Sequence, residues 1–324
     1  MIRLKNVSKK FDHRGIAGVT DINLDIKRGE VFCLMGPNGS GKTTLLNLIS
    51  KEITQDQGTL ETESEIAFFK SSRQDENDSL NVQKYLIQKN TLDIPDEKKL
   101  QLARDFADIF EFTFQLRQNF GQLSAGQKQK VELAAILVNQ PSLILLDEPF
   151  NHLDPFTRQD IFQTFFEYLS HKEISVLWVT HSFEEAFKYA HRMGFMNFGK
   201  LVQTGTPFEV LSNPRDLFVA KFLGHENFVT VSKSDGQWAT PWGPLSLDHP
   251  GSEAILVIPE TAWIEGTSSL SGRINKSWTT LQGRKFDIQF DSYRFIVQSS
   301  SYTLSDQDAL VMIPDFSRVF FIPL

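Results

Sequence analysis

Hydrophobic residues in the first two thirds of the chain form short uninterrupted runs, separated by longer stretches with helical spacing. The runs predict buried strands, and they cover residues 31–35, 65–69, 143–146 and 175–179. Between the second and third runs, residues such as Leu100, Ala103 and Phe106 share one helix face. Buried strands that alternate with helices predict an α/β domain whose central sheet is largely parallel.

Further local patterns predict additional strands, a turn and helices in the first two thirds of the chain. Residues 2–7 and 18–26 alternate with period two, which predicts an antiparallel strand pair, and 194–203 favours a hairpin. A turn is expected at 56–58. Helical spacing runs from residue 81 to about 119, through 125–138 and from about 155 to 170, with a short helix at 183–190.

The pattern changes after Gly224. Helices vanish beyond about Trp238, and short alternating strands are separated by Gly, Pro, Ser and Asp clusters. A connecting helix is expected at 213–223. We therefore predict an α/β domain over 1–224, followed over 225–324 by a small all-β barrel or sandwich.

Bulk properties narrow the class of protein. The 324 residues carry a formal net charge of −7 with no basic block, so nucleic acid is a poor candidate partner. Cys33 is the only cysteine, which suits a reducing cytoplasm. No apolar run approaches the roughly 20 residues of a membrane helix, and the N-terminus is unlike a signal peptide. The chain is expected to be soluble, or held at a membrane by a partner.

A glycine-rich loop follows the strand at 31–35 and precedes a helix. It fits the G-x-x-x-x-G-K-[ST] pattern of a phosphate-binding loop. Glycines let backbone N–H groups turn toward an anion, and the helix N-terminus adds partial positive charge. The lysine would reach the β- and γ-phosphates, and the next hydroxyl would bind Mg²⁺. The loop comprises Gly36, Pro37, Asn38, Gly39, Ser40, Gly41, Lys42, Thr43 and Thr44.

Three polar residues follow later strands of the same predicted sheet. Asp147 and Glu148 come directly after 143–146, and His181 follows 175–179. The ends of parallel strands meet at one edge, where ligands bind. Asp147 is therefore expected to meet the Mg²⁺ beside Thr43, Glu148 to polarise the attacking water, and His181 to contact the γ-phosphate.

Two further features are weaker candidates for contacts with a nucleotide. Ser124, Ala125 and Gly126 begin a helix and form a second anion-binding geometry, although a simple helix cap is the commoner meaning of such residues. Phe11, which lies 25 residues before Gly36, is either a stacking platform for adenine or a core residue of the hairpin.

Together these motifs resemble the ATP-binding subunit of an ABC transporter. Residues 36–43 match its Walker A loop, 123–127 with Gln127 its signature, and 143–147 with Glu148 its Walker B motif. Asp154 fits the D-loop and His181 the switch histidine. The resemblance implies a P-loop ATPase with a helical subdomain at about 76–139, and ATP and Mg²⁺ as its ligands.

Segments 202–207 and 218–224 resemble the importer ATPases of the sugar, polyamine, ferric iron and sulfate group. That group implies an OB-like regulatory domain over 225–324. It also implies a homodimer that holds two ATPs between its subunits, two transmembrane permease subunits and, indirectly, an extracytoplasmic solute-binding protein. The expected location is peripheral, on the cytoplasmic face of the inner membrane.

The chain departs from the family pattern at several positions. Ala125 and Ser182 stand where Gly and Asp are usual, and Lys130 and Ala135 where Arg is common. The glutamine that binds Mg²⁺ and senses the permease is assigned to Gln74, while Ser71 has the expected offset from strand 65–69.

Two other functions remain as alternatives. A non-transport ABC ATPase of DNA repair would insert a long coiled coil between Lys42 and Ser124, and a translation type would carry two cassettes. A regulatory protein that binds ATP without turnover would not need Glu148 and His181. Neither alternative fits as well as an importer ATPase.

Overall fold

The computed structural model forms two units, Met1–Pro207 and Phe208–Leu324. The assignment of an ATPase domain to 1–224 and an OB-like domain to 225–324 stays a prediction. The structure describes residues 1–11, 16–63, 65–70, 78–150, 153–246, 251–265, 272–280, 283–290, 292–299, 309–310, 312–315 and 317–323.

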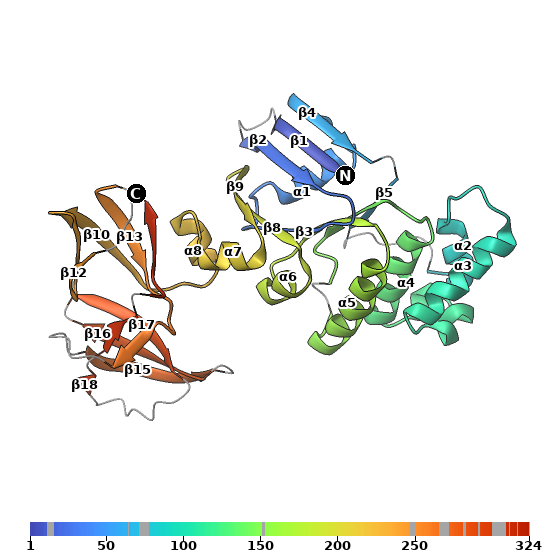
Figure 1. The fold of residues 1–324 in the computed structure, drawn as a ribbon. Coiled ribbons are helices and arrows are strands. Elements are labelled where there is room, and N and C mark those ends of the chain that lie inside the picture. Colours follow the sequence, from blue (N-terminus) through green and yellow to red (C-terminus); the bar gives the residue numbers. More distant parts are fainter. Residues whose placement is uncertain are drawn as a thin grey trace. The chain divides into compact units, whose positions relative to one another are not determined.

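A six-stranded sheet forms the centre of the first unit (Figure 1). Its neighbouring pairs are parallel except the last. The strands are, in spatial order, β5 (Ile66–Lys70), β6 (Leu143–Asp147), β7 (Ser175–Val179), β3 (Val31–Met35), β8 (Arg192–Asn197) and β9 (Lys200–Gly205). All residues of β3 and β7 are buried, which explains why their sequences are continuously apolar. The predicted α/β fold with a largely parallel core is confirmed.

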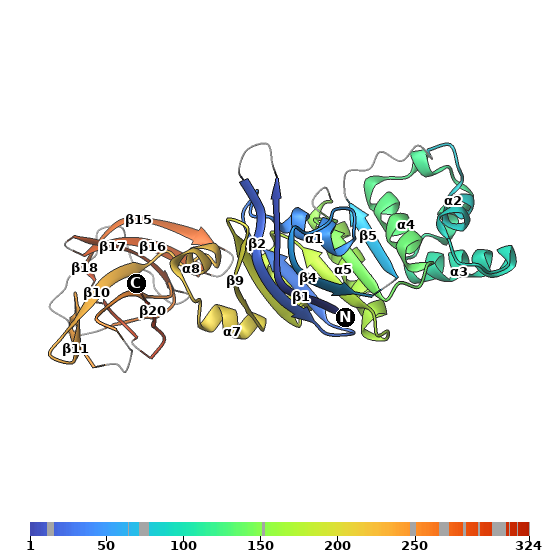
Figure 2. The ribbon, with the colours of Figure 1, turned by 90° about the horizontal axis from the view of Figure 1, so that it is seen from above.

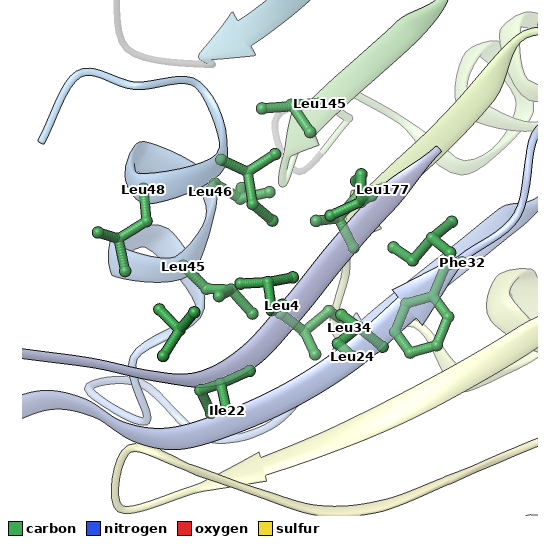
Figure 3. Packing of buried hydrophobic residues seen from close by; sticks show 14 of the residues in the cluster. Leu4, Ile22, Leu24, Phe32, Leu34, Leu45, Leu46, Leu48, Leu145 and Leu177 are labelled. Carbon is green, nitrogen blue, oxygen red and sulfur yellow. The ribbon is translucent and has the colours of Figure 1, made fainter. Parts of the chain in front are cut away.

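A three-stranded antiparallel sheet and helix α1 (Lys42–Ile49) cover one face of this central sheet (Figure 1). The small sheet has the order β2 (Ile16–Ile26), β1 (Ile2–Phe11) and β4 (Gln57–Thr62). Leu4, Leu24, Leu45, Leu145 and Leu177 meet in the core between these layers (Figure 3). Burial of these apolar side chains stabilises the packing of the small sheet and α1 on the central sheet.

The predicted turn at 56–58 is wrong, because Gln57 and Gly58 begin β4, which pairs with β1. Gly58 has φ 85°, and a Cβ there would lie 2.4 Å from the Asn6 carbonyl oxygen. Glycine is therefore required by a close backbone approach within the sheet.

Helices cover the opposite face. Trp178 of β7 packs against Phe162 and Phe166 of α5 (Pro155–Ser170), while its neighbour Leu177 faces α1. The helix α6 (Phe183–Tyr189) joins this layer through the stacked Tyr189 ring. Successive side chains of a strand point to opposite faces, so β7 serves both layers.

The helical pattern between residues 81 and 138 is divided. It forms α2 (Val82–Lys89), α3 (Asp96–Ile109), 3₁₀ turns at Thr113–Arg117 and Phe120–Gln122, and α4 (Ala125–Leu137). Asn81 and Ser124 cap α2 and α4 with their side chains, and Pro95 precedes α3. These helices gather at one end of the first unit in both views (Figures 1 and 2).

The second unit is mainly β. Its helices are α7 (Pro207–Ser212), which starts at the last residue of the first unit, and α8 (Leu217–Phe222). The connecting helix expected at 213–223 is present as α8 but starts four residues later, after Pro214, and α7 before it was not predicted. Ala220 of α8 packs on Ile255, Val257 and Ile322.

The strands of the second unit form two main sheets and one strand pair. Trp238, Trp263, Phe286 and Phe295 fill a shared core. One sheet has the order β12 (Gly243–Leu245), β11 (Gln237–Thr240), β10 (Phe228–Ser234), β13 (Glu253–Val257) and β20 (Phe320–Pro323); the other has β17 (Tyr293–Ser299), β16 (Gly283–Phe290), β15 (Gly272–Thr280) and β18 (Ala309–Leu310); β14 (Trp263–Glu265) pairs with β19 (Met312–Pro314).

Within the described residues of both units, no helix combines the length and the apolar character that crossing a membrane requires.

Candidate functional site

The glycine loop connects β3 to α1, and backbone carbonyl groups of adjacent segments pack closely against two of its glycines. Gly36 has φ 150°, and a Cβ at this position would lie 2.3 Å from the carbonyl oxygen of Met196. Gly41 has φ 103°, and a Cβ there would lie 2.4 Å from the carbonyl oxygen of Gly18. Both positions therefore exclude any side chain, for reasons of space and of backbone conformation.

The Lys42 ammonium lies inside this loop. Its Nζ donates hydrogen bonds to the carbonyl oxygens of Gly36 at 2.8 Å and Pro37 at 3.0 Å. Burial lowers the pKa of Lys42, and the carboxylates of Glu148 and Asp147 oppose that shift. The loop therefore contains the positively charged Lys42 ammonium. A bound phosphate would replace the loop carbonyls as its hydrogen-bond acceptor.

Asp147 and Thr43 form a pair of oxygen ligands at the end of β6. The Thr43 hydroxyl donates to Oδ2 of Asp147 at 3.0 Å. Burial raises the pKa of Asp147, so its charge lies where a cation would be favourable. Hard oxygen donors of this kind fit Mg²⁺, which takes few protein ligands beside phosphates and water. The described residues contain no cluster of three or more His, Cys, Asp or Glu side chains suited to a metal.

Glu148 and His181 are in contact across neighbouring strand ends. Nε2 of His181 lies 2.5 Å from Oε1 of Glu148. Glu148 has φ 49°, and its backbone N–H donates to the carbonyl oxygen of Val179 at 3.1 Å. This left-handed backbone is uncommon for a residue other than glycine, and here it turns the chain out of β6 beside β7. A water positioned by Glu148 would lose its proton to a carboxylate that His181 orients.

The start of α4 carries a second group of predicted residues. Ser124 Oγ accepts from the Gln127 N–H at 3.3 Å, and the Gln127 side chain accepts from the Ser124 N–H at 3.0 Å. This capping box leaves the N–H groups of Ala125 and Gly126 at the helix end. Asp154, which caps α5, lines the same hollow of about 480 Å³.

Other predicted residues have different positions. Phe11 is 45% exposed, and its ring and the Thr44 methyl group both lie against Gly18, beside the start of α1. Gln74 and Ser71, the two candidates for the permease-sensing position, lie outside the described residues. The described lining of the hollow at α4 contains none of residues 36–44.

Sequence reasoning missed two contacts between the elements that carry the predicted residues. Gln129 of α4 donates to the carbonyl oxygen of Pro149, the residue after Glu148, at 2.5 Å. Arg158 of α5 and Glu185 of α6 form an ion pair of 2.5 Å. Each partner of the second contact lies one helical turn after a predicted site residue, namely Asp154 and His181, but no pattern in the sequence pairs the two charges.

Comparison with known proteins identifies relatives of this chain. A family model described as ABC transporter matches residues 19–151. The glycine betaine/carnitine/choline transport ATP-binding protein OpuCA of Bacillus subtilis is 32% identical over 91% of this chain and 83% of its own length. The spermidine/putrescine import ATP-binding protein PotA of Borreliella afzelii is 28% identical over 97% of this chain and 96% of its own length.

Solved structures show the same fold. The ADP conformation of MJ1267, an ATP-binding cassette of an ABC transporter, covers 68% of this chain and 98% of its own, with 22% identity and a TM-score of 0.60. A dimeric post-hydrolysis state of the cassette MJ0796, bound to ADP and Pi, covers 64% of this chain and 99% of its own, with 27% identity and a TM-score of 0.54.

Proposed function

Because this chain belongs to the ABC transporter family and is an importer-type ATPase, we propose that it hydrolyses ATP at residues 36–44 through Glu148 and His181. The observation that carries this proposal is the gathering of Lys42, Thr43 and Asp147 with the Glu148–His181 contact. The three strands β3, β6 and β7 bring these residues together at one edge of the central sheet.

The proposed reaction is an in-line attack of water on the γ-phosphorus. The water gives its proton to Glu148 as the new P–O bond forms, and the bond to the β-phosphate oxygen breaks to leave ADP. Lys42 binds the β- and γ-phosphates, and His181 contacts the γ-phosphate while it orients Glu148. Thr43 and Asp147 would hold Mg²⁺, which neutralises phosphate charge when bound. Phe11 provides the exposed ring on which adenine stacks.

A second copy of the chain completes each site in this proposal. The N–H groups at Ala125 and Gly126 and the Asp154 cap face a hollow rather than their own loop. An anion bound there would come from the loop of another chain, as P-loop anions favour helix N-termini. The dimeric state of the 27% identical cassette supports this arrangement.

The permease partner is proposed to bind at the edge of the central sheet. β5 is an edge strand, and a hollow of about 450 Å³ lies beside it, lined from Glu65 to Lys70 and by parts of α2 and α4. A helix end of a membrane subunit would fit this groove and would place the complex at the cytoplasmic face of the membrane. Cargo choice is left to the partner subunits, since the relatives' named cargos include choline and spermidine as well as sulfate.

Three substitutions test the proposal. Glu148→Gln should abolish hydrolysis, retain ATP binding and trap dimers. Lys42→Ala should lose ATP binding itself. Ser124→Arg should leave the ATP affinity of the monomer nearly intact but prevent dimer closure. Turnover by Glu148→Gln at the wild-type rate, or ATP-driven dimerisation of Ser124→Arg, would contradict the assigned roles.

A further inference from the structure

Two helices that begin beside the site are joined by an ion pair. In this pair, Nη2 of Arg158 donates to Oε2 of Glu185 at 2.7 Å, and Nε lies 2.5 Å from Oε1. One charge-assisted hydrogen bond and a second close N–O contact therefore hold the carboxylate against the guanidinium. The pair connects the first turn of α5 to the first turn of α6.

Each partner is one helical turn from a proposed site residue. The Arg158 N–H donates to the carbonyl oxygen of Asp154 at 3.0 Å. The Glu185 N–H donates to Oγ of Ser182 at 3.4 Å, and Ser182 directly follows His181. The ion pair therefore links the helix that begins at Asp154, which is proposed to face a second chain, to the helix that follows His181, which contacts Glu148 of the same chain.

The surroundings of the pair restrict its motion. The side chains of Arg158 and Glu185 are 23% and 19% exposed, and the guanidinium lies 6.0 Å from the centre of the Phe162 ring. By contrast, Arg28 and Glu173 are 3.5 Å apart and are 69% and 82% exposed. Water screens an exposed pair of that kind, whereas a mostly buried pair holds its two elements together.

We propose that Arg158 and Glu185 are a positioning pair for hydrolysis, which makes Asp154 and His181 move as one body. Closure of a second chain against Asp154 then locks the existing contact between His181 and Glu148 in the geometry that hydrolysis needs, so each chain hydrolyses its ATP only when its neighbour is in place. This inference rests on the proposed function, because it assumes that two chains close on ATP.

The test uses the full-length chain and the variants Glu185→Gln, Arg158→Gln and the charge-reversed double variant Arg158→Glu/Glu185→Arg. The single variants should lower kcat by about tenfold, because a small displacement of a catalytic group is costly. ATP affinity and KM should change by less than about twofold, because no phosphate contact is lost. The charge-reversed pair should recover most of kcat, which a general loss of packing would not allow.

The exposed pair provides a matched control. Arg28→Gln and Glu173→Gln remove similar charges and should leave kcat unchanged. A kcat of Glu185→Gln within about twofold of wild type would overturn the inference, as would a charge-reversed pair no more active than the single variants. If Glu185→Gln unfolds, the charge-reversed pair alone decides between these outcomes.

The two proposals fail in different ways. If the wild-type chain neither binds ATP nor depends on Glu148, the proposed function fails and this inference fails with it. If Glu148→Gln is inactive while Glu185→Gln hydrolyses ATP normally, only the positioning role of the ion pair is refuted.

Discussion

Asp147 carries a charge whose burial costs free energy until a cation binds beside it. Burial raises the pKa of its carboxyl group, with the Thr43 hydroxyl and nearby lysines opposing the shift. A carboxyl group with a raised folded-state pKa favours folding most below its unfolded pKa, near 3.8. That contribution is lost as the pH rises through the folded-state value, so at neutral pH the charged group destabilises the nucleotide-free chain.

The first prediction follows from this sign. Without nucleotide and Mg²⁺, Asp147→Asn should raise the melting temperature at pH 7, and the difference should shrink as the pH falls toward 3.8. With ATP and Mg²⁺ the order should reverse, since the variant lacks a ligand oxygen charge. Thermal unfolding between pH 4 and 8 measures both effects.

Asp154 is the matched control for that experiment. Hydrogen bonds from Thr157 and Phe156 lower the pKa of its carboxyl group, so its contribution is present above pH 3.8 and lost as the pH falls. Asp154→Asn should therefore lower the melting temperature at pH 7. An Asp147→Asn chain that melts below wild type at pH 7 without ligands would contradict the burial argument.

At the scale of the element, α4 and α5 meet at a contact too close for a larger side chain. A Cβ at Gly126 would lie 2.5 Å from Cγ2 of Thr157. One turn further along each helix, Lys130 and Asp160 form an ion pair of 2.8 Å with the lysine 14% exposed. The two helix starts that carry Ser124 and Asp154 are thus held at a fixed separation.

The second prediction concerns this contact. Gly126→Ala should lower the free energy of unfolding by about 1–3 kcal/mol, the usual cost of overpacking. Thr157→Ser, which removes only the offending methyl group, should restore most of that loss in the double variant. Urea unfolding of the four proteins measures the coupling, and additive losses would show that the methyl contact is unimportant.

The elements differ in how well the sequence predicts them, for local reasons. Buried strands such as β3 and β7 can be predicted from the sequence, because strands buried on both faces of a parallel sheet are continuously apolar. β4 was missed because its side chains are mostly exposed and its Gly58 mimics a turn. The helix expected at 213–223 starts only at Leu217, because Pro214 and the Asp216 cap lie before it.

The residues of the candidate site also differ in how well the sequence predicts them, for the same local reasons. Residues of the glycine loop and the strand ends are predictable because their chemistry depends on neighbours in sequence. The Arg158–Glu185 and Lys130–Asp160 pairs join different helices, and charges on helix surfaces carry no local sign of their partners. The left-handed backbone of Glu148 has no sequence signal either, because its backbone N–H bonds to Val179 of β7, a residue distant in sequence.

At the scale of the whole molecule, the two units divide at residue 207, whereas composition changes at 224. All described residues of the proposed site lie before 207. The helix α8 belongs to the second unit, since Ala220 packs with Ile255, Val257 and Ile322. A chain that ends at Gly224 would keep α8 but remove its packing partners.

The third prediction compares two truncations. Chains 1–207 and 1–224 should both bind ATP with the affinity of the full chain. The longer chain should bind a hydrophobic dye more strongly and aggregate sooner, because the apolar side of α8 is uncovered. Equal dye binding by both would count against the role of α8, and loss of ATP binding by 1–207 would show that the first unit needs the second.

Cys33, the only cysteine of the sequence, is fully buried in β3, and burial raises its thiol pKa. It therefore works as a built-in reporter: an alkylating reagent can modify it only when the central sheet opens. The labelling rate should measure the opening equilibrium of the first unit with no engineered probe. ATP at a hundred times its dissociation constant should slow labelling about a hundredfold, because the ligand stabilises only the closed form.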